Sequence, residues 1–166
     1  MGWSDPDLPL QTLMRGRYIR DPDKLPPEAG CYILDIRLEA EFPLRRPSRF
    51  ATGAGGWPES LGPGCYFYCG SASGPGGLRA RVGRHFNPIK SVRWHIDQLT
   101  VGGRVAGALV FEKASHPALS ECILAAMLQA PSIGATVSLD GFGSSDCRGC
   151  PSHLVRHQHS LLSLFA

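Results

Sequence analysis

The sequence predicts a single small α/β domain of the α+β type, in which a mainly antiparallel three-stranded central sheet is flanked by helices. Hydrophobic residues make up 43% of the 166 residues, which is enough for one compact core. Three short runs rich in β-branched and aromatic residues are interspersed with two helix-compatible runs. The first two strand candidates are joined by a loop without a helical crossover, which favours antiparallel pairing.

The elements can be placed in order along the chain. Residues 1–27 are rich in proline and aperiodic, so we expect an extended leader with at most one short helical piece before a domain spanning 28–166. The glycine- and proline-rich residues 40–64 predict a loop that is peripheral to the chemistry and tolerates shortening. "VRWHIDQLT" predicts a short helix or turn. We expect strands near 31–38, 65–70 and 104–112, and helices near 77–87 and 117–130.

No apolar run is long enough to span a bilayer, and the N-terminus lacks a basic-then-apolar signal pattern. Six cysteines in such a chain favour thiols or metal ligands over a disulfide framework. Four of them, Cys122 included, lie in apolar runs, where cysteine behaves as a small hydrophobe. We therefore expect an intracellular, cytoplasmic protein without a membrane partner.

The charge distribution is lopsided, although the net charge of +3 is mild. No acidic residue lies between Glu59 and Asp97. A block of positive charge is what a phosphate-backbone surface needs, and the alternative is a solvated basic helix face. The block contains Arg79, Arg81, Arg84, Lys90 and Arg93, together with His85 and His95.

The strand "CYFYCG" alternates its side chains. Cys65, Phe67 and Cys69 predict a core face, and Tyr66 and Tyr68 are expected on the other face, exposed or lining a cleft. These tyrosines are candidates for chemistry.

Two helices carry further candidates. Arg81 and His85 are four residues apart and share a helix face. Gly76 and Gly77 at the helix start would let the backbone approach an anion. Glu121 is a single carboxylate in the apolar run "ALSECILAAML", and its face is either exposed or occupied by a partner or metal.

These stretches resemble the GIY-YIG nuclease superfamily. The resemblance rests on "GCY" at 30–32, "YCG" at 68–70, the helix "LRARVGRH" and the acidic residue Glu121. In this order, "GCYFYCGSASG", "RHF", "RWHIDQLT", "EC" and "GFGSSDCRGCPSHL" resemble the DUF123 branch over residues 28–157.

The resemblance implies a divalent-metal-dependent endonuclease that hydrolyses DNA phosphodiester bonds in repair or processing, with RNA not excluded as a substrate. Mg²⁺ or Mn²⁺ would be held by Glu121. Arg81 would stabilise the phosphate, and Tyr68 with Tyr32 would position or deprotonate water, with a pKa lowered by Arg81 and the metal. The implied catalytic set is Tyr32, Tyr68, Arg81, His85 and Glu121, and the implied DNA contacts are Arg79, Arg84, Lys90 and Arg93.

That reading requires the five catalytic residues to line one concave basic surface, with the Glu121 carboxylate at its floor. A partner protein or a homodimer would supply substrate specificity. In "RWHID", Trp94 and Ile96 are expected in the core, and Arg93, His95 and Asp97 form either a polar network at the cleft or a surface cluster.

A second constellation lies near the C-terminus. "CRGCPSH" spaces Cys147, Cys150 and His153 as three zinc ligands, and His95, Asp146 and His157 are candidates for the fourth. The alternative is a tight loop whose cysteines pack. Besides the nuclease, two functions therefore stay open: a non-catalytic nucleic-acid-binding domain and a zinc-stabilised interaction module.

Overall fold

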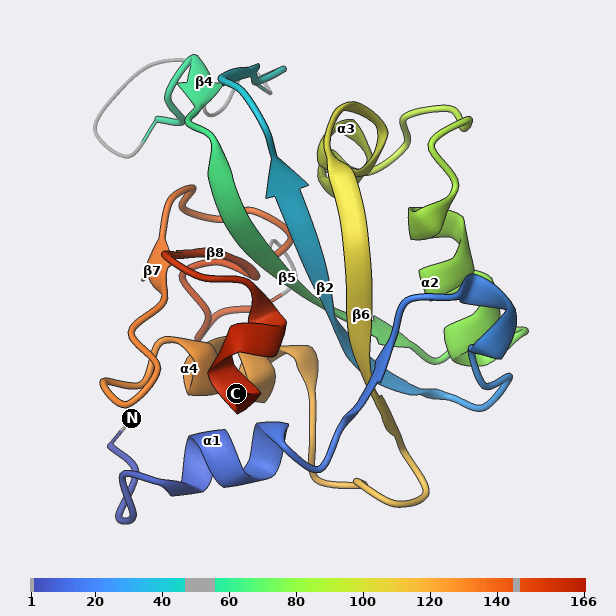
Figure 1. Cartoon of the computed structure of the whole chain (residues 1–166), viewed down its shortest axis with the longest axis vertical. Helices are drawn as coiled ribbons and strands as arrows, with labels where there is room; N and C mark the ends of the chain where they lie inside the picture. Colours follow the sequence, from blue (N-terminus) through green and yellow to red (C-terminus); the bar gives the residue numbers. More distant parts are fainter. Residues whose placement is uncertain (1, 47–55, 145–146) are drawn as a thin grey trace.

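The chain is built around an antiparallel sheet. The computed structural model describes residues 2–46, 56–144 and 147–166. Within them the main sheet has six strands in the order β1-β6-β2-β5-β8-β7, and all neighbouring pairs are antiparallel (Figure 1). The strands are β1 (Arg17–Ile19), β2 (Gly30–Leu38), β5 (Gly64–Ala72), β6 (Arg104–Glu112), β7 (Thr136–Val137) and β8 (Leu154–His157).

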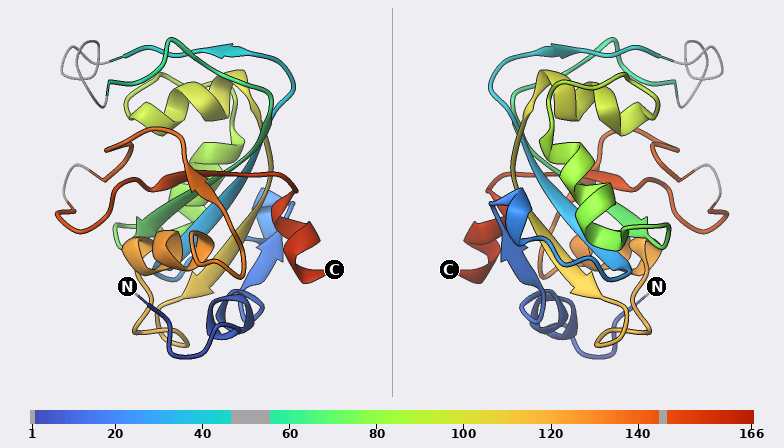
Figure 2. Two further views of the ribbon diagram at one scale, coloured as in Figure 1. Left: turned by 90° about the vertical axis from the view of Figure 1, so that its left-hand side faces the viewer. Right: turned by 90° about the vertical axis from the view of Figure 1, so that its right-hand side faces the viewer.

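Helices cover both faces of this sheet (Figure 2). Helices α2 (Gly77–Phe86) and α3 (His95–Gly102) pack on one face, and α4 (Glu121–Leu128) packs on the other with α1 (Leu8–Leu13) against it. Each face therefore carries its own apolar core. The smaller elements are a two-stranded sheet of β3 (Phe42–Pro43) and β4 (Ser60–Leu61), and the 3₁₀ helices η1 (Pro22–Lys24) and η3 (Leu161–Phe165).

The antiparallel α/β architecture is confirmed, but the expected number of three strands is wrong. The three expected strands are β2, β5 and β6 at the centre of the sheet. The three additional strands have only two to four residues each, too few for a period-two pattern to be recognised. One of them, β1, lies in the supposedly extended leader and pairs with β6 at the edge of the sheet.

Strand β5 alternates between the two cores. Cys65, Phe67 and Cys69 join the core under α4, as expected. Tyr66 is 1% exposed and Tyr68 is half-buried, so the expectation of an exposed tyrosine face is wrong for Tyr66. Both faces are covered here, because α2, α3, β4 and the residues after β7 enclose the tyrosine side.

The start of α2 is closed by the leader. The N–H groups of Leu78 and Arg79 donate to the carbonyls of Glu28 and Pro26, 2.9 and 2.8 Å away. Gly77 has a φ of 54°, and a Cβ there would lie 2.2 Å from the carbonyl oxygen of Pro27. Gly77 thus allows the leader backbone to pass directly against the start of α2. The sequence suggested that an anion could bind at this helix start, but these N–H groups are already bonded to the leader.

The predicted helix at 117–130 is shorter than expected. Helix α4 begins at Glu121, because the Ser120 side chain caps it by accepting a hydrogen bond from the Ile123 N–H, 3.2 Å away. The expected short helix in "VRWHIDQLT" is α3. Ile96 is buried as predicted, but Trp94 is 39% exposed and does not belong to the core.

The segment 40–64 contributes to the core, although it was expected as a loop. Leu44, Trp57 and Leu61 are buried in the core of the α2 face. The Trp57 indole N–H donates to the Asp140 carbonyl, 2.8 Å away. Residues 47–55 lie outside the described residues, so their tolerance to shortening stays a prediction.

None of the helices in the described part of the chain has the length and apolar character needed to cross a membrane.

Candidate functional site

Four of the five predicted catalytic residues meet on the α2 face of the sheet. Tyr32 comes from β2, Tyr68 from β5, and Arg81 and His85 from α2. The Tyr32 hydroxyl and His85 Nε2 are 2.9 Å apart. The ring centroid of Tyr68 lies 6.3 Å from that of His85, in an edge-on arrangement. The fold therefore brings together groups that are widely separated in the sequence.

Gly70 makes room for this cluster. Its partner across the β2–β5 ladder is Tyr32, and a Cβ on Gly70 would lie 2.4 Å from the Tyr32 hydroxyl. Any other residue would push the phenol out of place. The glycine of "YCG" is thus required by the tyrosine of "GCY".

The side chains of Tyr32, Tyr68 and His85 are all uncharged at neutral pH. Burial raises the pKa of Tyr32 well above its ordinary value and that of Tyr68 to about 12, and in both cases the Arg81 charge opposes the shift without cancelling it. Burial, then the charges of Lys90 and Arg81, lowers the pKa of His85 to about 3. The sequence led us to expect that the Arg81 charge, together with a metal ion, lowers the pKa of a tyrosine. Among the described residues, burial has a larger effect than Arg81, so the pKa of each tyrosine is raised.

The hydrogen-bonding roles follow from these charge states. A protonated Tyr32 accepts a hydrogen bond from Arg81 and donates to Nε2 of the neutral His85. The proton of the imidazole then lies on Nδ1, which is buried without a hydrogen-bond partner among the described atoms. The pair is shielded from solvent, because Tyr32 and His85 are each only 1% exposed.

Tyr68 and Arg81 reach a surface pocket of about 310 Å³ that is also lined by Arg93, His95 and Gly143. At its edge the exposed Trp94 lies between two guanidinium groups. The Cζ atoms of Arg81 and Arg84 are 4.0 and 4.3 Å from its ring centroid. This stack presents cations and a flat aromatic ring to solvent.

The predicted DNA-contacting cations differ in their surroundings. Arg84 forms a bidentate pair with Asp97, with Nη2 to Oδ2 at 2.8 Å. Lys90 donates to helix carbonyls and Arg79 to a leader carbonyl, whereas Arg93 is exposed. Asp97, fully buried, also accepts the N–H groups of Arg93 and Trp94 just before α3. The hydrogen bond from Arg84, followed by those from the two N–H groups, lowers the pKa of Asp97 despite burial. The basic block is thus partly neutralised.

The fifth predicted residue, Glu121, lies at the first turn of α4 on the other side of the sheet. It lines a separate pocket of about 180 Å³ with Lys113 and His116, and it is not the floor of the Tyr68 pocket. Ser71 and Ser73 line both the Glu121 pocket and a pocket of about 360 Å³ that contains Arg81. The end of β5 therefore separates the carboxylate from the cations.

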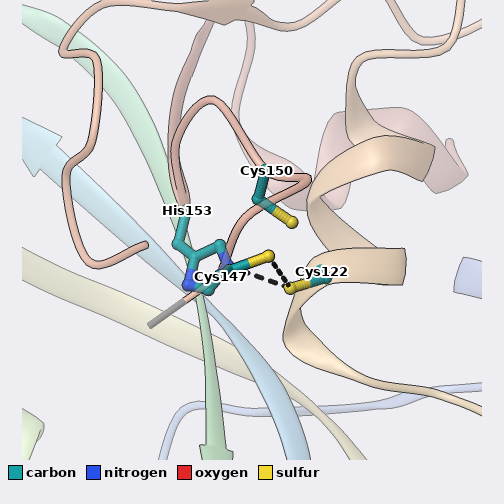
Figure 3. A group of neighbouring side chains, drawn as sticks. All are labelled: Cys122, Cys147, Cys150 and His153. Carbon is teal, nitrogen blue, oxygen red and sulfur yellow. Dashed lines mark hydrogen bonds between the residues drawn. The ribbon is translucent and has the colours of Figure 1, made fainter. Parts of the chain in front are cut away.

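The predicted zinc ligands come together, and Cys122 joins them. The sulfur atoms of Cys122, Cys147 and Cys150 point toward one another and toward the His153 ring (Figure 3). All four ligand atoms lie within 4.8 Å of one another. Cys122 Sγ is 2.9 Å from Cys147 Sγ and 3.4 Å from His153 Nε2. The hydrogen bond from Cys122 lowers the pKa of Cys147 to about 7.

The two described candidates for the fourth ligand, His95 and His157, do not belong to this cluster. His157 Nε2 contacts the Ile133 carbonyl at 3.0 Å, and the His95 ring packs 5.1 Å from that of Trp57. Asp146 lies outside the described residues. Cys122 was missed because it lies in an apolar run, yet the polar "SE" before it marks the open end of a helix, where a side chain is not enclosed by the core.

The cluster offers three sulfur atoms and one imidazole, a ligand set that could hold a metal ion such as zinc. Across residues 2–46, 56–144 and 147–166 there is no second group of three or more cysteine, histidine or carboxylate ligands.

Comparisons with known proteins place this site in a family. Neither the curated proteins nor the solved structures contain a significant match to the chain. A family model described as "Domain of unknown function DUF123" matches residues 32–165, which include all the residues of both clusters. This match covers most of the sequence and confirms the resemblance to DUF123, whereas the resemblance to GIY-YIG nucleases stays a prediction. The chain therefore belongs to the DUF123 family.

Proposed function

We propose that this protein is a divalent-metal-dependent endonuclease that hydrolyses phosphodiester bonds of DNA. The observation that carries the proposal is the convergence of Tyr32, Tyr68, Arg81 and His85 beneath a pocket with an exposed cationic rim. These residue types, at these positions, are those that the resemblance to GIY-YIG nucleases implies. A purely structural role gives no reason for a guanidinium to meet two phenols and an imidazole.

In this mechanism Arg81 binds the scissile phosphate. Its guanidinium is planar, carries several donors and is held against Trp94, which restricts its rotation. Tyr68 has a pKa of about 12, so it remains protonated and donates a hydrogen bond to the phosphate or to the attacking water. Tyr32 and His85 are positioning residues, because both are enclosed: Tyr32 accepts a hydrogen bond from Arg81, and His85 holds the Tyr32 hydroxyl.

Glu121 is the proposed metal ligand. A carboxylate suits Mg²⁺ or Mn²⁺, which bind proteins through one or two carboxylates and complete their shells with phosphate oxygens and water. Such an ion would neutralise charge on the phosphate and on the leaving oxygen. The phosphate would then bridge the end of β5, with Arg81 on one side and Glu121 on the other.

The experiment is cleavage of labelled duplex, single-stranded, flapped and branched DNA, and of matched RNA, with Mg²⁺ or Mn²⁺. Arg81→Ala should lower the rate by about 10²–10³-fold, as for the loss of one charge-stabilising donor. Glu121→Gln should lower it while DNA affinity stays nearly unchanged. Matched controls are Arg15→Ala and Glu59→Gln, two exposed residues that line none of these pockets.

Equal rates for Arg81→Ala and wild type would overturn the catalytic proposal. Absence of cleavage on every substrate, with DNA still bound, would favour a second candidate, a nucleic-acid-binding module without turnover. The specific observation behind this candidate is the Arg81–Trp94–Arg84 stack, since exposed aromatic rings flanked by arginine bind unpaired bases. A partner protein or a second copy of the chain would add substrate selectivity in either case.

A further inference from the structure

We propose that Cys122, Cys147, Cys150 and His153 form a structural Zn²⁺ site that fastens the Cys147–His153 segment to the start of α4. Cys122 is the ligand that completes the site. The ion would not take part in hydrolysis. It would instead connect the two pockets of the candidate nuclease centre.

The geometry is close to that of a zinc tetrahedron. With Zn–S and Zn–N distances of about 2.3 and 2.0 Å, neighbouring ligand atoms should be separated by roughly 3.3–3.8 Å. The four ligand atoms here lie within 4.8 Å of one another, and the Cys122–His153 distance is 3.4 Å. Shifts of about 1 Å in side chains would suffice to reach coordination distances.

The chemistry of the ligands selects the metal. Thiolates and an imidazole favour zinc over the oxygen-seeking Mg²⁺ and Mn²⁺. Four protein ligands leave no open position, which is typical of structural and not catalytic zinc. On binding, the three thiols lose their protons to solvent, and no redox change occurs.

The surroundings of His153 support its role as a ligand. The residue is only 5% exposed, and its ring forms a hydrogen bond with the backbone of Gly143. Zinc-bound histidines usually have their second ring nitrogen fixed by such a partner. The His153 carbonyl in turn accepts the Cys69 N–H of β5, 2.9 Å away, so this ligand is held at the sheet.

The site reaches both candidate pockets. Cys122 directly follows Glu121, the proposed Mg²⁺ ligand. On the other side, Gly143 has a φ of 67° and lies so near Tyr68 that a Cβ there would be 2.8 Å from its ring. A bound ion would thus hold the first turn of α4 and one wall of the Tyr68 pocket in a fixed relation.

The direct test is the metal content of the full chain. Purified protein should carry about one zinc per chain, and Cys122→Ser or His153→Ala should weaken zinc binding by more than about a hundredfold in competition with a chromophoric chelator. The matched control is Cys65→Ala, a buried cysteine of β5 outside the cluster, which should keep its zinc. Zinc retained at wild-type affinity by Cys122→Ser would overturn the assignment.

Two further measurements do not depend on variants that fold. Replacement of the metal by Co²⁺ in the wild-type chain should produce the intense visible bands of tetrahedral thiolate coordination. Mass determination without reductant should show six free thiols; a Cys122–Cys147 disulfide in the isolated protein would overturn the proposal. Both readouts are independent of DNA cleavage. Failure of the nuclease proposal would therefore not affect the zinc proposal, and failure of the zinc proposal would not affect the nuclease proposal.

Discussion

The buried pair of His85 and Tyr32 predicts a specific dependence of stability on pH. His85 is 1% exposed, and its burial beside Lys90 and Arg81 lowers its pKa to about 3, against 6.5 for an exposed histidine. The perturbation is His85→Gln. Its side-chain amide can still bond to the Tyr32 hydroxyl but does not titrate, so it removes the proton uptake and keeps the contact.

The sign follows from proton binding. Below pH 6.5 the unfolded chain protonates this imidazole, whereas the folded chain resists protonation until about pH 3. The stabilising contribution is therefore fully present above pH 6.5 and is lost as the pH falls toward 3. Between pH 7.5 and 4.5, the wild-type free energy of unfolding should drop by about 2–3 kcal/mol through this residue alone.

The assay is urea denaturation of wild type and His85→Gln at half-unit steps from pH 4.5 to 7.5. Other titrating groups, including Asp35, whose burial raises its pKa, occur in both proteins and cancel in the difference. Release of any bound metal cancels in the same way. His159→Gln is the matched control, because that ring is exposed. Parallel curves for wild type and His85→Gln would refute the neutral, enclosed histidine.

Three substitutions test the packing around the site by thermal and urea unfolding. Trp57→Ala should cost about 3–5 kcal/mol, because it removes a large ring that is 2% exposed. Gly70→Ala should cost about 1–3 kcal/mol, because its methyl group would meet the ring of Tyr32. Asp97→Asn should cost about 1–3 kcal/mol, because it leaves Arg84, which is partly exposed, without its carboxylate.

Each of these substitutions has a control in the same chain. Trp94→Ala should destabilise the fold much less than its buried counterpart, since this ring is 39% exposed. Gly74→Ala should be tolerated, since nothing lies within 4 Å of a Cβ there. Asp7→Asn should have little effect, since this side chain makes no capping bond. A control that lost as much stability as its test variant would contradict the contact in question.

The centre of the fold was predictable because its signals are long. Strands β2, β5 and β6 have nine residues each, and their apolar and β-branched content is visible without a structure. The edges were not predictable, because β1 owes its place to pairing with β6 and not to its own three residues. The same holds for Trp57, which is buried in a core built by distant segments and whose indole N–H donates to the distant Asp140 carbonyl.

The convergence of Tyr32, Tyr68, Arg81 and His85 was predictable, but the position of Glu121 and the electrostatics of the site were not. The spacing of Arg81 and His85 placed them on one helix face, and the loop between the first two expected strands indicated that they pair antiparallel. Burial decides whether a phenol beside a guanidinium becomes more or less acidic, and sequence does not show burial. Cys122 was not predicted as a ligand for a related reason. An apolar run indicates which helix face is buried, but it does not show that a residue lies in the first turn, where its side chain can reach a neighbouring loop.

Strand β5 connects the two clusters through the sheet. Its side chains alternate, so Tyr68 faces the Arg81 pocket while the next residue, Cys69, faces α4. The Cys69 N–H holds the His153 carbonyl, and Gly143, bonded to the His153 ring, packs on Tyr68. Displacement of His153 would therefore reach Tyr68 along two routes, through β5 and through Gly143. Loss of zinc should for this reason alter the Tyr68 pocket, even though no zinc ligand lines it.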